Sequence, residues 1–331
     1  MPASFASLPH TLVEDIVETC LHSFGDVHAS RRAAVALCLV SSSFLYPARK
    51  HLYRSVSLDL ERPTSLAFLR SMRMRGQRRP APNQLESASD SLAGLVRGLL
   101  LSTVAGRFAN GEASRQAAGR LQDILASCPR LEKIRFTPDD DARNYDMLYA
   151  RAWSAAHASL RSFTLVISRF RDLVLLPTDS STGPLQSLTI ELAHDGDLQW
   201  DYDILLASWP DASQCISTAE LHLVNLTFSD EVMVDKLEQL CRAIHPPQRI
   251  RLTGCEFSRK AINALLRWAA PSLMHLETHL LRITDGRGRP CYDYVLPSLP
   301  KLQTLESKWT IVLLRKYSEP SCAIANPGVI L

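Results

Sequence analysis

Two histidines and a glutamate form the segment of this sequence that most resembles a metal or catalytic site. His275 and His279 are four residues apart, with Glu277 between them. Zinc proteases carry such histidines on a helix, with the glutamate directly after the first one. The pattern here is typical of a strand instead, in which the two imidazoles have separate surroundings. We therefore expect a structural segment and no metal site.

Acidic residues cluster at positions 194–203, which include Asp195, Asp197, Asp201 and Asp203. Carboxylates this close can bind calcium, but the segment lacks the residue order of an EF-hand and its closing glutamate. A solvated loop is the favoured interpretation. No Gly-rich phosphate loop and no nucleophile motif is convincing elsewhere. The sequence thus predicts neither catalytic residues nor a cofactor, and we expect a protein that is not an enzyme.

The cysteines favour the same conclusion. The chain contains eight, and the nearest pair, Cys241 and Cys255, is 14 residues apart. Because no C-x-x-C pair occurs, neither a zinc knuckle nor a redox pair is indicated. We expect the cysteines to be small buried hydrophobic residues in a reducing compartment.

Composition indicates a folded protein of ordinary charge. Of 331 residues, 46% are hydrophobic and 21% are charged, and the net charge is +3. This charge is too small to indicate nucleic acid as a partner. The first residues lack the basic region of a secretory signal, and no apolar run reaches the length of a membrane span. We expect an intracellular protein, cytoplasmic or nuclear, with no membrane partner.

The first 58 residues predict three short helices and a strand. The first helix, after Pro9, has two adjoining apolar rows, with Leu12, Ile16, Cys20 and Phe24 in one and Val13, Val17 and Leu21 in the other. The second helix begins near Ser30 as N-cap, and its apolar face extends to Phe44. Ser41–Ser43 weaken this helix near its end. Pro47 lies in the first turn of the third. Residues 53–58 then alternate as a half-buried strand.

This region resembles an F-box, most closely the F-box-like proteins that are numerous in mushroom-forming fungi. The residues that match the pattern are Leu8, Pro9, Leu12, Asp15 and Ile16; Leu39, Val40, Ser41 and Phe44; and Ala48, Arg49, Leu52, Tyr53, Arg54, Ser55 and Val56. The sequence departs from the pattern at Thr11, usually acidic, and at Ser42, usually basic. The resemblance implies docking on the Skp adaptor of an SCF-type (cullin) ubiquitin ligase. The set that would form the docking surface and the core of the module is Leu8, Pro9, Leu12, Ile16, Leu39, Val40 and Phe44.

The rest of the chain contains an internal repeat. Hexamers with a Leu or Ile core begin at residues 96, 131, 160, 185, 218, 247, 273 and 302, and from 131 onward they are 25 to 33 residues apart. Segments typical of helices lie before several of them, at 117–128, 235–244 and 259–270. A strand and a helix per repeat, with Leu-x-x-Leu spacing, are typical of leucine-rich repeats. The asparagines of regular repeats are largely missing, so these repeats resemble the irregular ones that follow many F-boxes. A doubly wound α/β enzyme is the alternative.

The predicted fold class is therefore α/β, with an N-terminal three-helix F-box followed by an irregular leucine-rich-repeat solenoid of parallel strands and outer helices. We assign residues 5–52 to the F-box-like domain, 53–315 to the repeats and 316–331 to a C-terminal tail. Within the repeats, residues 62–92 form a basic and polar insert. Residues 62–79 contain six arginines and no acid, and a repeat helix that runs into a basic loop is favoured over a localisation signal.

Acidic residues follow three of the predicted strands. They are Asp139, Asp140, Asp141, Asp195, Asp197 and Asp230. If the strands are parallel, these residues lie on one rim of the array, where they could bind a basic segment of a target protein. Ordinary solvated loops are the alternative. The function expected from the whole sequence is a substrate-recognition adaptor of an SCF-type ubiquitin ligase, and the alternative is a repeat scaffold with no ubiquitin role.

Overall fold

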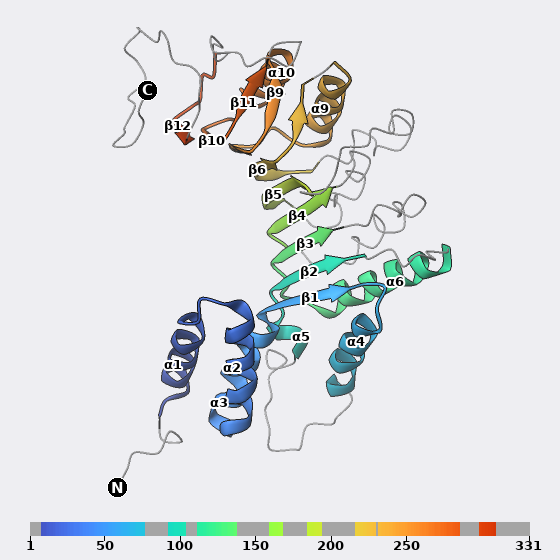
Figure 1. The fold of residues 1–331 in the computed structure, drawn as a ribbon, viewed down its shortest axis with the longest axis vertical. Helices are drawn as coiled ribbons and strands as arrows, with labels where there is room; N and C mark the ends of the chain where they lie inside the picture. The colour runs from blue at the N-terminus through green and yellow to red at the C-terminus, as the bar shows by residue number, and fades with distance from the viewer. Residues whose placement is uncertain are drawn as a thin grey trace.

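The computed structural model describes residues 8–76, 92–103, 111–137, 159–167, 184–193, 216–229, 231–284 and 298–308. These residues form a module of three helices at one end of the molecule and a long sheet that leads away from it (Figure 1). Further helices pack on one face of the sheet. In the described part of the chain, no helix is long and apolar enough to cross a membrane.

The described strands of the long sheet number nine and are all parallel, and their order in the sheet follows their order in the chain. They are β1 (Ser55–Asp59), β2 (Gly98–Ser102), β3 (Lys133–Thr137), β4 (Ser162–Ile167), β5 (Leu185–Leu192), β6 (Thr218–Val224), β8 (Arg249–Thr253), β10 (His275–His279) and β12 (Thr304–Lys308). All nine predicted strands are confirmed. Because each repeat adds one strand to the same edge, the fold is a solenoid of the leucine-rich-repeat kind. A doubly wound sheet, by contrast, reverses its strand order at a switch point.

Strand alternation gives the sheet a buried face and an open face. The buried face carries in-register rows of apolar side chains, for example Leu101, Phe136, Leu165 and Ile190 on β2 to β5. The helices pack against these rows in one continuous core. The open face carries the alternate residues, which are mostly polar.

The described helices of the solenoid all contribute buried residues to the core of the repeats. They are α4 (Pro63–Gly76), α5 (Leu92–Leu95), α6 (Gly111–Ser127), α9 (Glu231–Ala243) and α10 (Arg259–Ala269). The predicted helices at 117–128, 235–244 and 259–270 are thereby confirmed. In α4, Leu69 and Met72 are buried, whereas Leu66 is exposed. The basic segment at 62–79 thus begins as a repeat helix.

The N-terminal module consists of α1 (His10–His22), α2 (Val27–Val40) and α3 (Ser42–Arg54). Three expectations for it were wrong. The N-cap of α2 is Asp26, not Ser30, because the Asp26 carboxylate accepts hydrogen bonds from the backbone N–H groups of residues 28 and 29. Phe44 belongs to α3, and Pro47 lies inside that helix. Ser41 explains the positions of Phe44 and Pro47. It has an extended backbone, and its Oγ accepts from the Ser43 N–H, so a new helix starts at once.

A second, small parallel sheet was not predicted. It contains β7 (Thr227–Phe228), β9 (Glu256–Ser258) and β11 (Arg282–Thr284). Each of these short strands follows a left-handed residue at the end of a main strand. Beside the second of these residues, the buried Cys255 Sγ donates to the Leu223 carbonyl oxygen at 3.3 Å. This bond ties neighbouring repeats together.

Candidate protein-binding surfaces

Helix α1 divides its two apolar rows between the core and the surface. Val13, Val17 and Leu21 are buried in the core of the module, with Ala34 and Phe44. The neighbouring row is exposed, since Leu12 is 45% and Ile16 is 41% accessible. A helix that needed only an internal core would carry polar residues in this second row. The second row therefore marks a candidate interface.

The end of α2 adds two more exposed apolar side chains, Leu39 at 84% and Val40 at 70% accessibility. Helices α1 and α2 are joined by a short turn, so the start of α1 and the end of α2 lie at the same end of the module. The contacts of Leu8 and Leu37 with one core cluster agree with this placement. We name Leu12, Ile16, Leu39 and Val40 the module surface.

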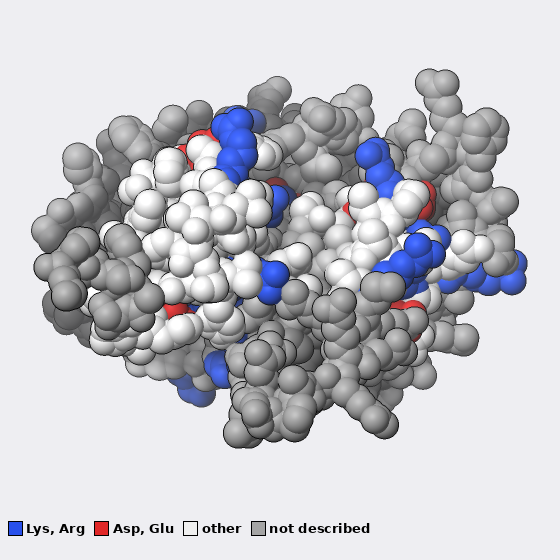
Figure 2. All heavy atoms as spheres, turned by 90° about the horizontal axis from the view of Figure 1, so that it is seen from below, with Lys and Arg blue, Asp and Glu red and all other residues white. Residues whose placement is uncertain are grey.

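The seven residues that the F-box resemblance implies differ in burial: some lie in the core of the module and others are exposed. Phe44 is buried in the core, and Leu8 is partly buried against it. Pro9 is exposed and is the N-cap of α1. Thr11 and Ser42, where the sequence departs from the family pattern, are both exposed. Figure 2, which shows this end of the molecule, has uncharged atoms over much of the described surface.

Polar ties between the three helices hold the module surface in place. Ser30 of α2 is buried, and its hydroxyl donates to the Leu21 carbonyl oxygen of α1 at 2.9 Å. The Ser30 Oγ also lies 2.9 Å from His51 Nε2 of α3. Since the hydroxyl hydrogen is already used, the imidazole N–H donates to Ser30. Burial, and secondarily the charges of His22 and Arg54, lower the pKa of His51, which favours the neutral ring.

The open face of the sheet is the second candidate surface, and several of its charges form ion pairs across strands. Glu220 on β6 accepts from Arg249 at 3.3 Å and lies 3.5 Å from Arg251, both on β8. Arg251 donates to Glu277 on β10 at 2.6 Å. Burial alone would raise the pKa of Glu277, but hydrogen bonds from Arg251 and His279 outweigh it and lower the pKa. The result is a ladder of ion pairs across three strands.

A further ion pair spans the middle of the open face. Nη1 and Nη2 of Arg135 on β3 donate to the Glu191 carboxylate on β5, at 2.8 and 3.1 Å. The pair therefore crosses β4. Val166 on β4 pairs with Glu191 in register, and although it lies on the open face, it is buried. The ion pair can account for that burial, because the apolar stem of an arginine covers its neighbours.

The predicted strand with His275, Glu277 and His279 is confirmed as β10, and its alternation places all three residues on the open face. His275 Nδ1 lies 2.6 Å from Thr304 Oγ1, whereas His279 Nε2 lies 3.0 Å from Glu277 Oε1. The two imidazoles thus have separate surroundings. Among the described residues, no group of three or more His, Cys, Asp or Glu side chains could hold a metal ion.

The described cysteines agree with the expectation of burial only in part. Cys128, Cys241 and Cys255 are buried, and burial raises their pKa values to about 12, 12 and 11, which keeps the thiols protonated. Cys20 is exposed on α1, because it belongs to the outward row with Leu12 and Ile16. Cys215, Cys291 and Cys322 lie outside the described residues.

The proposed acidic rim lies outside the described residues in full. This applies to Asp139, Asp140, Asp141, Asp195, Asp197 and Asp230, and also to the rest of the acidic segment at 194–203 and to the C-terminal tail. The rim therefore stays a prediction. The surfaces that sequence reasoning missed are the ion-pair ladder and the Arg135–Glu191 pair. Strand alternation placed those residues on one face, but the sequence alone did not give the register between strands.

Comparison with known proteins identifies no family for this chain. No protein-family model matches the chain, and no curated protein matches it. A similar solved structure is that of the leucine-rich repeat-containing protein LegL7 from Legionella pneumophila, with 13% sequence identity and a TM-score of 0.29. The match covers 73% of this chain and 89% of that one. The fold described above rests on strand order and register.

Proposed function

We propose that this protein is a non-catalytic adaptor. Its N-terminal module would dock on the Skp adaptor of an SCF-type ubiquitin ligase, and its repeats would bind a target protein. The observation that carries the proposal is the module surface, where α1 and α2 expose four large apolar side chains. Large apolar side chains exposed together on one module are typical of a protein interface.

The size of the exposed apolar surface supports a docking role. Full burial of a Leu, Ile or Val side chain contributes about 1.5–3 kcal/mol. Leu39 and Val40 expose most of their side chains, so burying these two on a partner would contribute roughly 3 kcal/mol. Losing that contribution would weaken binding by about 100-fold.

The repeats would bind the target. On the open face, the charges of Glu220, Arg251 and Glu277 are already paired, so a target that binds there gains little from long-range attraction. The acidic rim remains a separate proposal for basic target segments. In either case the adaptor would act by holding the target near a ligase-bound conjugating enzyme, which raises the effective concentration of the target lysines.

Co-purification with a Skp adaptor tests the docking step. The full chain carrying Leu39→Gln and Val40→Gln should lose at least ten-fold of the adaptor that the unmodified chain retains. Both side chains are highly exposed, and glutamine is a good helix former, so the fold should persist. Leu8→Ala is a poorer test, because Leu8 contacts the core of the module.

The matched control replaces exposed apolar residues outside the module. Leu66 on α4 and Val232 on α9 are 37% and 41% accessible, and Leu66→Gln with Val232→Gln should leave adaptor binding unchanged. Full adaptor binding by the Leu39/Val40 variant would refute docking through this surface. If the unmodified chain itself captures no adaptor, a repeat scaffold with no ubiquitin role becomes the better reading.

A further inference from the structure

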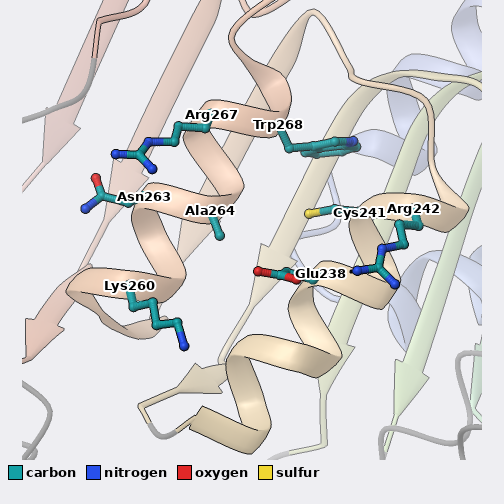
Figure 3. A pocket seen from close by; sticks show the side chains of 8 residues that line it. All are labelled: Glu238, Cys241, Arg242, Lys260, Asn263, Ala264, Arg267 and Trp268. Atoms are coloured by element: carbon teal, nitrogen blue, oxygen red, sulfur yellow. Dashed lines mark ion pairs between the residues drawn. The ribbon is translucent and has the colours of Figure 1, made fainter.

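A groove runs between α9 and α10 on the helical side of the solenoid, away from both surfaces described above. It has a volume of about 470 Å³, which is within the range of small ligand sites. Figure 3 shows Cys241 of α9 and Ala264 and Trp268 of α10 along it. The small side chain of Ala264 leaves space that a larger residue would fill.

Basic side chains predominate around this groove. Its lining contains Arg242, Lys260 and Arg267 but only one carboxylate, that of Glu238. Arg267 makes no hydrogen bond or ion pair with any described residue, and it extends from the outer side of α10 in Figure 3. A net positive lining of this kind complements a negatively charged partner.

Two ion pairs in this region are long and exposed to solvent. Arg242 lies 3.6 Å from Glu238, and Lys260 lies 3.9 Å from Glu231, whose side chain is 92% accessible. Exposed pairs at such distances contribute little to stability. A partner carboxylate could therefore bind Lys260 without breaking a strong interaction.

We infer that the groove binds an acidic segment of a partner protein. Lys260 and Arg267 are seven residues apart on α10, which is about 10.5 Å along the helix axis. An extended segment rises about 3.3 Å per residue, so carboxylates three residues apart match this separation. The Trp268 indole, partly buried against the core, points toward α9 and provides apolar surface within the groove. Such a site would give the protein a second partner, bound on the side opposite the target.

Fluorescence anisotropy with the full chain tests this inference. The probe is a labelled peptide Gly-Ser-Glu-Leu-Gly-Glu-Gly-Ser, compared with the same peptide in which both glutamates are glutamines. The glutamate peptide should bind at least ten-fold more tightly, and this preference should fall as salt rises. Lys260→Glu with Arg267→Glu should abolish it. Ala264→Leu, which fills the groove and keeps every charge, should also weaken binding.

The control double variant makes the same change in net charge at two positions outside the groove. Arg161→Glu with Lys301→Glu alters two exposed cations that do not line the groove, and it should bind the glutamate peptide as the unmodified chain does. Several results would overturn the inference: no binding at millimolar peptide, equal affinity for the two peptides, or equal loss in the control. Tighter binding of a single-stranded RNA oligonucleotide of equal charge would assign the groove to nucleic acid instead.

Discussion

Three main strands are each followed by a residue with a left-handed backbone, and the residue type differs among the three. Asn225 follows β6 with φ 57°, Gly254 follows β8 with φ 63°, and Leu280 follows β10 with φ 53°. Glycine and asparagine adopt this conformation readily, whereas leucine does not. The Leu280 side chain is also 66% accessible, so little packing compensates for the cost.

Leu280→Gly should therefore stabilise the protein. Relief of the left-handed backbone outweighs the greater chain entropy of glycine in the unfolded state, and we expect a gain of about 0.5–1 kcal/mol in the free energy of unfolding. Urea denaturation of the full chain measures it. A loss of stability would show that the Leu280 side chain makes a contact that matters.

The reverse change at the preceding repeat should have the opposite sign. In Gly254→Ala, the new Cβ would collide with the Asn225 side chain, and the residue would retain a positive φ. We expect a loss of about 1–3 kcal/mol in the same assay. Similar effects for the two variants would contradict this account of the turn.

At the scale of the elements, the module depends on the tie between α1, α2 and α3 through Ser30 and His51. The pKa of His51 is lowered in the folded chain, chiefly by burial. As pH falls below about 6.5, the unfolded chain takes up a proton that the folded chain binds less well. Acidification therefore destabilises the folded state until the pH passes below the folded pKa.

His51→Gln should reduce this pH dependence. Glutamine keeps an N–H that can donate to Ser30 but does not titrate. Unfolding of both chains is measured at pH 7 and pH 5, and the unmodified chain should lose more stability between the two. His222, whose pKa burial also lowers, acts in the same direction and is present in both chains, so it cancels in the comparison. Identical losses would show that His51 does not couple to folding.

The elements that the sequence predicted correctly are those with a strong period. Alternating residues around a Leu or Ile core located all nine main strands. The strands β7, β9 and β11 have two or three residues each, which is too short for any period, and they form only by pairing between repeats. The division of the α1 rows was equally hidden, because both rows are apolar and the packing of α2 and α3 decides which is buried.

At the scale of the whole molecule, the module and the solenoid are joined without a linker. Helix α3 ends at Arg54 and β1 begins at Ser55. Arg31 of α2 donates to the Ser55 carbonyl oxygen at 3.1 Å, and the Arg97 N–H donates to that of Arg54 at 3.1 Å. Tyr46 and Tyr53 of α3 pack against the core of the repeats. Helix α3 thus belongs to two cores, which fixes the module relative to the repeats.

This junction predicts that the module is not stable alone. Its own core contains only Val13, Val17, Leu21, Ala34 and Phe44 among the described residues, and so small a core is marginal without further support. In a fragment of residues 1–58, the backbone amides of α1 to α3 should exchange with solvent at least ten-fold faster than in the full chain. In the full chain, Arg31→Gln should speed exchange in the module and leave β5 and β6 unchanged. If the fragment protects its amides as well as the full chain does, the repeats contribute nothing to the stability of the module. The three helices would then be stabilised by their own core and by the hydrogen bonds of Ser30 alone.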